Sequence, residues 1–225
     1  MKTISYQTID STNIEAQRLL DSGEDLPFVV VAEEQTHGKG RGEHVWETES
    51  GKNLTCSFVV KPYVEPQYQY LITVATSLAI LDLLSQYLST ENQIKIKWPN
   101  DIFVDDNKIC GILIANRISG NEIKSSIIGI GVNVNQIDFP VNLPNATSLK
   151  KITNKEFDIN ELLSELIILL ENNIIMIKDN VLHLRVRYIR NLYKLHQPMI
   201  YNVDGVEMEC KISGIDEFGG IMCDK

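Results

Sequence analysis

Four short β-branched runs follow one another in the middle of the chain, and they constrain its fold more than any other feature. They cover residues 94–98, 102–104, 108–116 and 122–134. Turn-forming residues separate them, at Asp105-Asp106-Asn107 and at Ser119-Gly120-Asn121. Because such short connections join neighbouring antiparallel strands, the pattern predicts an antiparallel meander.

Helical and strand patterns on both sides of this meander predict an α+β fold. A helix is expected after the capping residues Asp10-Ser11-Thr12-Asn13, and apolar residues at helical spacing predict a core helix over residues 67–88. Two more helices are expected over residues 157–177 and 181–195. Further strands are expected over residues 28–32, 53–60, 199–201, 206–215 and 220–222. A boundary near residues 196–198 sets off the last three strands as a small β module.

Composition and charge exclude several classes of protein. Of the 225 residues, 44% are hydrophobic and 23% charged, which excludes a disordered tail, a collagen-like fibre and a coiled coil. The net charge of −9 opposes the phosphate neutralisation on which DNA binding depends. No apolar stretch reaches the roughly 18 uninterrupted residues of a membrane helix, and no signal-peptide core begins the chain. We therefore expect a cytoplasmic protein with no DNA or membrane partner.

The four cysteines and four histidines lack the spacing of a zinc site. Cys56 and Cys110 fall in apolar, strand-like runs, where a free thiol is usually a small buried hydrophobe. No metal site is therefore expected from these residues.

A glycine-rich loop fills residues 35–52, longer than a simple connection and so typical of a functional or disordered segment. It contains Gly38-Lys39-Gly40-Arg41-Gly42, whose glycines let the backbone approach a ligand and form an anion-binding nest. Lys39 and Arg41 add positive charge to an acidic chain. The loop matches neither the P-loop nor the Rossmann pattern. Taken by itself, it is explained better by a flexible solvated loop.

Two other motifs place polar residues beside strands. Lys97-Trp98-Pro99-Asn100-Asp101 precedes Lys108 and Gly111, and Pro99 ends its strand so that Asn100 and Asp101 lie at a turn. A hairpin with a surface lysine explains either piece taken separately. In Gly129-Ile130-Gly131-Val132-Asn133, the two glycines indicate close approach of a ligand or another backbone. A bulged strand with a hydrogen-bonded core asparagine explains this motif equally well.

Taken together and in order, these motifs closely resemble those of biotin–protein ligases. The resemblance continues through Trp46, Gly51-Lys52-Asn53-Leu54 and Ala146-Thr147-Ser148-Leu149, so that it covers essentially the whole chain. It implies a mixed, largely antiparallel sheet packed with helices, similar to class II synthetases and biotin–lipoate ligases, as a catalytic domain over residues 1–196. It also implies a small SH3-like β-barrel module over residues 197–225.

The resemblance implies a reaction in two steps. Biotin's carboxylate attacks the α-phosphate of Mg-ATP, giving biotinyl-5′-adenylate and pyrophosphate, and a lysine of a biotin carboxyl carrier domain then takes the acyl group and releases AMP. Arg41 and Lys108 match the family's positions for the carboxylate and the α-phosphate, and are the implied catalytic residues. The implied biotin-binding residues are Ser11, Thr12, Asn13, Gln35, Lys39, Gly40, Arg41, Lys108 and Gly111. The implied ATP- or adenylate-binding residues are Trp46, Asn100, Asp101 and Asn133. Magnesium would arrive on ATP, with Asp101 able to assist it.

The loop departs from the family pattern G-R-G-R-x-G-R-x-W at three positions. Lys39 keeps a positive charge but lacks the planar fork of an arginine. Glu43 and His44 stand where the family has a glycine and a cation. We expect these changes to loosen retention of the adenylate.

The sequence leaves several alternatives open. A lipoate–protein ligase or octanoyl transferase has the same fold, and a non-catalytic biotin sensor would keep the pocket without turnover. Retention of both Arg41 and Lys108 favours the enzyme over the sensor. Because the first motif begins at Asp10, we expect no N-terminal helix-turn-helix domain such as repressor relatives carry. Both a monomer and a homodimer fit the pattern.

Overall fold

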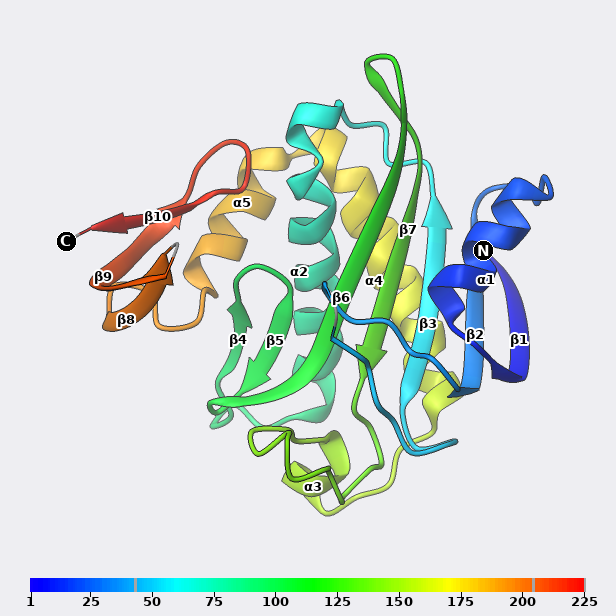
Figure 1. Cartoon of the computed structure of the whole chain (residues 1–225), viewed down its shortest axis with the longest axis horizontal. Coiled ribbons are helices and arrows are strands. Elements are labelled where there is room, and N and C mark those ends of the chain that lie inside the picture. The colour runs from blue at the N-terminus through cyan, green and yellow to red at the C-terminus, as the bar shows by residue number, and fades with distance from the viewer. Residues whose placement is uncertain (43, 204, 225) are drawn as a thin grey trace.

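The structure is a computed structural model that describes residues 1–42, 44–203 and 205–224. A seven-stranded sheet forms its centre, in the order β1-β2-β3-β7-β6-β5-β4 (Figure 1). Its strands are β1 (Lys2–Ile9), β2 (Phe28–Gln35), β3 (Leu54–Val60), β4 (Ile94–Lys97), β5 (Asp101–Val104), β6 (Asn107–Ser119) and β7 (Glu122–Val132). β1 and β2 are parallel, and every other neighbouring pair is antiparallel. The expected mixed, largely antiparallel α+β architecture is confirmed.

Helices cover both faces of this sheet (Figure 1). On one face lie α2 (Tyr70–Tyr87), which follows the 3-10 turn η1 (Pro66–Tyr68), and α4 (Ile159–Asp179). α5 (Val181–Arg190) packs against both of these helices. α1 (Thr12–Asp21) lies on the opposite face, and the short helix α3 (Leu149–Thr153) follows the segment after β7.

Because successive side chains along the strands point to opposite faces, the sheet contributes to two hydrophobic cores. Val29, Phe58 and Ile128 belong to the large core beneath α2 and α4. Their neighbours Phe28, Val59 and Ile127 belong instead to a small core with Ala16 of α1. Because successive side chains of a strand point to opposite faces, the buried central strands are apolar on both sides over this part of the sheet.

Helix α2 is apolar because it is a core helix. The segment Pro66–Tyr87 is long and apolar enough to cross a membrane by length and composition, but 61% of its most apolar window is buried inside the structure. It packs against both the sheet and α4, so its composition follows from burial in the protein core.

Three features differ from the sequence-based expectations. β1 was not expected, because this strand forms an edge of the sheet and carries mostly exposed polar residues in place of a β-branched run. α3 was not expected because it is only five residues long, capped by the hydroxyl of Ser148. α5 ends at Arg190 and not at residue 195, because the following turn places Lys194 and His196 at positive φ.

The C-terminal strands form a separate antiparallel sheet of three strands. β8 (Pro198–Val203), β9 (Val206–Ile215) and β10 (Ile221–Asp224) are ordered β10-β9-β8. Strands therefore form at the three predicted positions in the tail. Closure into an SH3-like barrel and the domain boundary near residue 196 stay predictions.

Replacement of Leu166 by alanine tests the α4 contribution to the large core. Leu166 is fully buried, so we expect Leu166→Ala to lower the free energy of unfolding by about 2–5 kcal/mol through lost burial and a new cavity. Ile168→Ala on the same helix is the control, because Ile168 is 59% exposed and its loss should stay within about 0.5 kcal/mol. Urea denaturation measures both, and equal losses would contradict the packing of α4.

Candidate functional site

A cavity of about 410 Å³ opens on the face of the sheet that carries α1. It lies between the start of α1, the glycine-rich loop and strands β3, β5, β6 and β7, and the loop crosses in front of β6 and β7 (Figure 1). The structure brings together in its lining all but one of the predicted site residues: Ser11, Thr12, Asn13, Gln35, Lys39, Gly40, Arg41, Trp46, Asn100, Asp101, Lys108 and Gly111. Asn133 is not among the lining residues.

Glycines of β6 and β7 form the floor of this cavity. Gly111 lies directly opposite Gly131 in the β6–β7 register, and Gly129 is two residues further along the same face. A Cβ atom at Gly131 would lie 2.3 Å from Cε2 of Trp46, and one at Gly129 would lie 2.2 Å from Oδ1 of Asn13. The glycines therefore admit two side chains from elsewhere in the chain, where the sequence predicted a ligand or another backbone.

A cluster of neutral polar groups occupies the α1 end of the cavity. The backbone N–H and the hydroxyl of Thr12 donate to Oε1 of Gln35, at 2.7 Å and 3.1 Å. The hydroxyl of Ser57 lies within hydrogen-bonding distance of both Thr12 Oγ1 and Asn13 Oδ1. This end presents donors and acceptors side by side, as recognition of a neutral polar ligand requires.

Ser57 was missed by the sequence analysis. The signal that identifies it is alternation within a buried strand, because Thr55 and Ser57 are polar residues two apart among apolar ones in β3. Both side chains are buried on the cavity face, and Thr55 lines the cavity itself. A polar pair at that spacing predicts a polar contact on one face of the strand.

The start of α1 is held by Asp10. The carboxylate accepts a hydrogen bond from the backbone N–H of Ser11 and pairs with Arg18 in the last turn of the helix. The Arg18 guanidinium lowers the pKa of Asp10 below its usual value. This pairing fixes the backbone from which Ser11, Thr12 and Asn13 extend.

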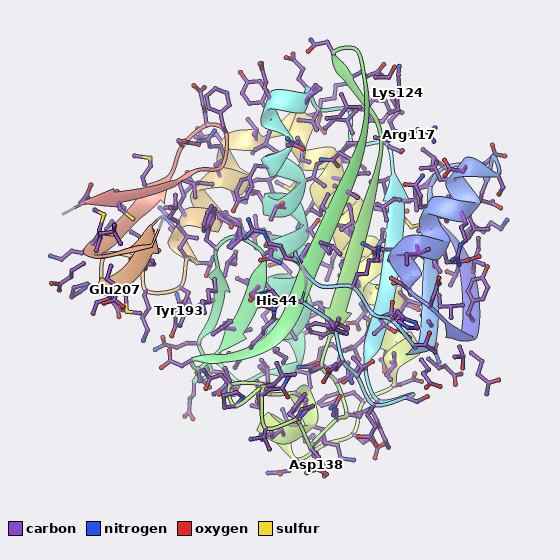
Figure 2. The ribbon with its side chains drawn as sticks, in the orientation of Figure 1. His44, Arg117, Lys124, Asp138, Tyr193 and Glu207 are labelled. Atoms are coloured by element: carbon purple, nitrogen blue, oxygen red, sulfur yellow. The ribbon has the colours of Figure 1, made fainter. Side chains whose placement is uncertain are left out.

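The glycine-rich loop folds back on itself as a small hairpin. Gly40 N–H donates to the carbonyl of His44 at 2.8 Å, and Trp46 N–H donates to the carbonyl of Gly38 at 2.9 Å. A Cβ atom at Gly38 would lie 2.3 Å from the carbonyl oxygen of Trp46. The two arms of the hairpin can therefore pair this closely only because residue 38 is a glycine. Figure 2 shows His44 in front of the sheet, and Glu43 lies outside the described residues.

Lys39 and Arg41 extend from this hairpin as exposed cations. Neither has an ion-pair partner among the residues that the structure describes. They are therefore available to an anion in the cavity.

Lys108 and Asp101 form an ion pair at the other end of the cavity, with Nζ and Oδ1 2.8 Å apart. The Lys108 ammonium also lies 5.6 Å from the centre of the Trp46 ring. The backbone of Lys108 is held from the far side, because its N–H donates to the carbonyl of Asn145 and its carbonyl accepts from Thr147. Lys108 is thus a positioned cation beside an aromatic ring.

Asn100 is attached to β6 by two hydrogen bonds. Its Nδ2 donates to the carbonyl of Ile112, and the N–H of Ile112 donates to the carbonyl of Asn100, each at 2.9 Å. The turn that carries Asn100 and Asp101 is therefore fixed against the strand that carries Lys108.

Asn133 is buried, and it supports Lys108 indirectly, through a hydrogen bond to Thr147, the residue that binds the carbonyl of Lys108. Its Nδ2 donates to the carbonyl of Thr147 at 2.9 Å, and its backbone N–H donates to the carbonyl of Ile109. The structure therefore places Asn133 outside the cavity lining and gives it the hydrogen-bond partners that a core asparagine needs. Its contact with a nucleotide stays a prediction.

Gln136 is a second residue that the sequence analysis missed. Its Oε1 accepts from Asn53 Nδ2 at 2.6 Å and from the N–H of Glu49 at 3.2 Å, and its Nε2 donates to the carbonyl of Asp138. This buried amide joins the base of the glycine-rich loop to the segment after β7. A lone glutamine carries no spacing signal, so the sequence offered no means of finding it.

Cys56 contributes to the cavity wall without offering a nucleophile. It is fully buried, and burial raises the pKa of its thiol well above the usual value. Among the described residues, no three His, Cys, Asp or Glu side chains are grouped so that they would hold a metal ion. The charged and polar groups that line the cavity are its cations, the carboxylate of Asp101 and neutral polar side chains.

Comparison with known proteins gives the family of the chain. The sequence profile of the biotin/lipoate A/B protein ligase family matches residues 5–133, which is more than half of the sequence. The chain belongs to this family. The matched region includes every predicted site residue.

Several relatives and solved structures are similar to it. The bifunctional ligase/repressor BirA of Bacillus subtilis is 32% identical over 158 residues, which are 69% of this chain and 48% of the relative. A biotin–[acetyl-CoA-carboxylase] ligase of Mycobacterium tuberculosis is 31% identical over 73% of this chain and 61% of the relative. The chain thus spans about half the length of the first of these curated relatives. The structure of a biotin protein ligase from Aquifex aeolicus in complex with biotin and ATP superposes with a TM-score of 0.81, at 25% identity, over 99% of this chain and 91% of that one.

Replacement of Gly131 by alanine tests the packing of Trp46 on the glycine floor. The new Cβ atom would overlap the indole, so we expect Gly131→Ala to displace Trp46 and shift its fluorescence to longer wavelength. Overpacking of this kind should cost about 1–3 kcal/mol of stability in urea denaturation. Gly214→Ala is the control, because the nearest atom to its new Cβ is Ile189 Cδ1 at 4.0 Å. An unchanged emission spectrum in Gly131→Ala would show that Trp46 lies elsewhere.

Proposed function

We propose that this chain is a biotin–protein ligase that activates biotin with ATP and transfers it to a lysine of a carrier domain. The observation that carries the proposal is one cavity with a neutral polar cluster at one end and the Lys108–Asp101 pair at the other. The loop that spans it carries two cations, Lys39 and Arg41, which have no ion-pair partner in the described part of the chain. The names of the relatives, and the biotin and ATP bound in the Aquifex aeolicus structure, support this reading.

Biotin would lie with its ureido ring in the polar cluster. A ureido group has both N–H donors and a carbonyl acceptor, and the cluster of Thr12, Asn13 and Gln35 offers partners of both kinds. An acid without these groups would leave the buried polar atoms of the cluster unpaired, at a cost in affinity. Ser11, Lys39, Gly40 and Gly111 would complete the biotin site along the cavity wall.

The carboxylate of biotin would point toward Lys108 and Arg41. Attack of one anion on another requires that positioned cations offset their repulsion, and such stabilisation is usually the largest catalytic contribution. Lys108 would hold the carboxylate and the α-phosphate together, and Arg41 would close over them from the loop. The carboxylate oxygen forms the new bond to phosphorus while the bond to pyrophosphate breaks.

In the second step, the ε-amine of the carrier lysine attacks the acyl carbon of the adenylate and AMP leaves with the bonding electrons. Trp46, Asn100, Asp101 and Asn133 would contact the nucleotide in both steps. Asp101 is already engaged by Lys108, and no acidic cluster accompanies it in the described part of the chain. We therefore propose that magnesium arrives on the phosphates of ATP.

The acceptor we propose is the biotin carboxyl carrier domain of acetyl-CoA carboxylase, the enzyme in the names of two relatives. A lipoate–protein ligase or octanoyl transferase of the same fold is the second candidate. A cytoplasmic location, a monomeric or homodimeric state, the absence of DNA and membrane partners and an SH3-like barrel at the C-terminus remain predictions from the sequence.

Replacement of Lys108 by alanine tests the proposed chemistry. In single-turnover transfer of biotin to a carrier domain with Mg-ATP, we expect Lys108→Ala to lose about 100- to 1,000-fold in rate, because one positioned donor to the reacting anion is removed. Lys124→Ala is the matched control and should retain the wild-type rate, since Lys124 lies at the far end of the β6–β7 hairpin (Figure 2).

Three outcomes would contradict the proposal. Equal rates for the wild type and Lys108→Ala would remove Lys108 from the chemistry. Tight biotin binding without adenylate formation would indicate a non-catalytic biotin sensor and not an enzyme. Transfer of lipoate in preference to biotin would leave the fold assignment intact and would make lipoate the substrate in place of biotin.

Replacement of His44 by arginine tests retention of the adenylate. His44 lines the cavity where the family pattern has a cation, so we expect His44→Arg to slow release of biotinyl-5′-adenylate by up to about 5-fold, the effect of one exposed charge pair. His37→Arg adds the same charge on the loop outside the cavity and should not change the release rate. A chase with unlabelled biotin and ATP measures release, and identical rates for His44→Arg and the wild type would contradict the expected loosening.

A further inference from the structure

The turn between β9 and β10 is a rigid element at residues 216–220. Oδ1 of Asp216 accepts hydrogen bonds from the backbone N–H groups of Phe218 and Gly220, at 2.9 Å and 2.8 Å. The N–H of Asp216 donates to the carbonyl of Gly220, and Gly219 adopts a φ of +92°. Because its own backbone groups are paired, this turn presents a fixed shape to its surroundings.

This turn packs against the start of α2 and against α5. The ring of Phe218 stacks on Tyr68, with ring centres 6.1 Å apart. Gly219 lies so close to Tyr70 that a Cβ atom there would come within 2.0 Å of its ring. Arg185 of α5 donates to the carbonyl of Asp216 at 2.8 Å. The C-terminal sheet is therefore attached to the main body of the protein through its β9–β10 turn.

One further contact joins this turn to the segment that leads into the cavity. Trp98 is half-buried, and its Nε1–H donates to the carbonyl of Gly219 at 3.0 Å. Trp98 does not line the cavity itself, but Asn100 and Asp101 follow it by two and three residues and both line it. These two residues are in turn attached to β6, through Ile112 and Lys108.

We propose that Trp98 is a positioning residue through which the C-terminal β9–β10 turn fixes the Asn100–Asp101 side of the cavity for the nucleotide. This inference rests on the proposed function. The polar cluster at the α1 end has its own supports in Asp10, Gln35 and Ser57, none of which contacts Trp98 through a hydrogen bond in the described structure. Loss of the Trp98 bond should therefore affect the nucleotide and spare biotin.

Trp98→Phe tests this inference, because it removes the N–H donor and keeps an aromatic ring. We expect the KM for ATP in adenylate formation to rise about 5-fold, the effect of one lost hydrogen bond, while the Kd for biotin stays within 2-fold of the wild type. Direct titration with Mg-ATP should show the same loss of affinity without turnover. A general loss of structure would instead change both ligands and the unfolding midpoint together.

A second variant approaches the same contact from the other side. Gly219→Ala should displace the turn from Tyr70 and so produce the same selective loss toward ATP with Trp98 intact. Gly23→Ala is the matched control, because Gly23 has nearly the same φ of +90° but nothing within 4 Å of its new Cβ. It should bind both ligands as the wild type does.

Unchanged ATP parameters in Trp98→Phe would overturn the inference, as would equal losses for ATP and biotin. A wild type that forms no biotinyl-5′-adenylate would refute the proposed function instead. In that case equal Mg-ATP affinities for the wild type and Trp98→Phe would refute the inference by themselves.

Discussion

The pairing of β6 with β7 is the constraint on which the site depends. Its register sets Gly111 opposite Gly131 and turns both toward α1, so that the sheet has a bare floor at this place and apolar side chains on its other face. A slip of one residue would turn the floor toward α2 and bring isoleucines into the cavity. The buried apolar face therefore enforces the register, and the open floor follows from it. Trp46 and Asn13 occupy that floor because no Cβ atom obstructs them.

The residues around the floor come from distant parts of the chain, and backbone hydrogen bonds bring them together. Gln136 fastens the base of the glycine-rich loop, and the segment of Asn145 and Thr147 holds the backbone of Lys108. Both supports belong to the connection between β7 and α3. This connection thus serves two walls of the cavity, and its buried amides Asn135 and Gln136 are paired with backbone and side-chain groups.

Sequence patterns predicted most of the fold because its central strands are β-branched and its turns are rich in Asp, Asn and Gly. They failed for β1, whose polar edge residues carry little strand signal, and for α3, which is too short to show a period. For the site, the motifs identified the residues that extend into the cavity. They did not identify Ser57 or Gln136, whose roles depend on tertiary neighbours 45 and 83 residues away in the chain. They also predicted a nucleotide contact for Asn133, which stays a prediction, and the structure adds a hydrogen bond by which this buried residue supports Thr147.

In the ion pair with Lys108, the carboxylate of Asp101 competes with any anion that enters this end of the cavity. Because the Lys108 charge is already compensated at 2.8 Å, a small anion that reaches it must displace an equivalent partner and gains little. A ligand that presents several negative oxygens at once can engage Lys108 and the loop cations together, and so outcompete Asp101. The pair thereby discriminates by the number of anionic contacts a molecule can make.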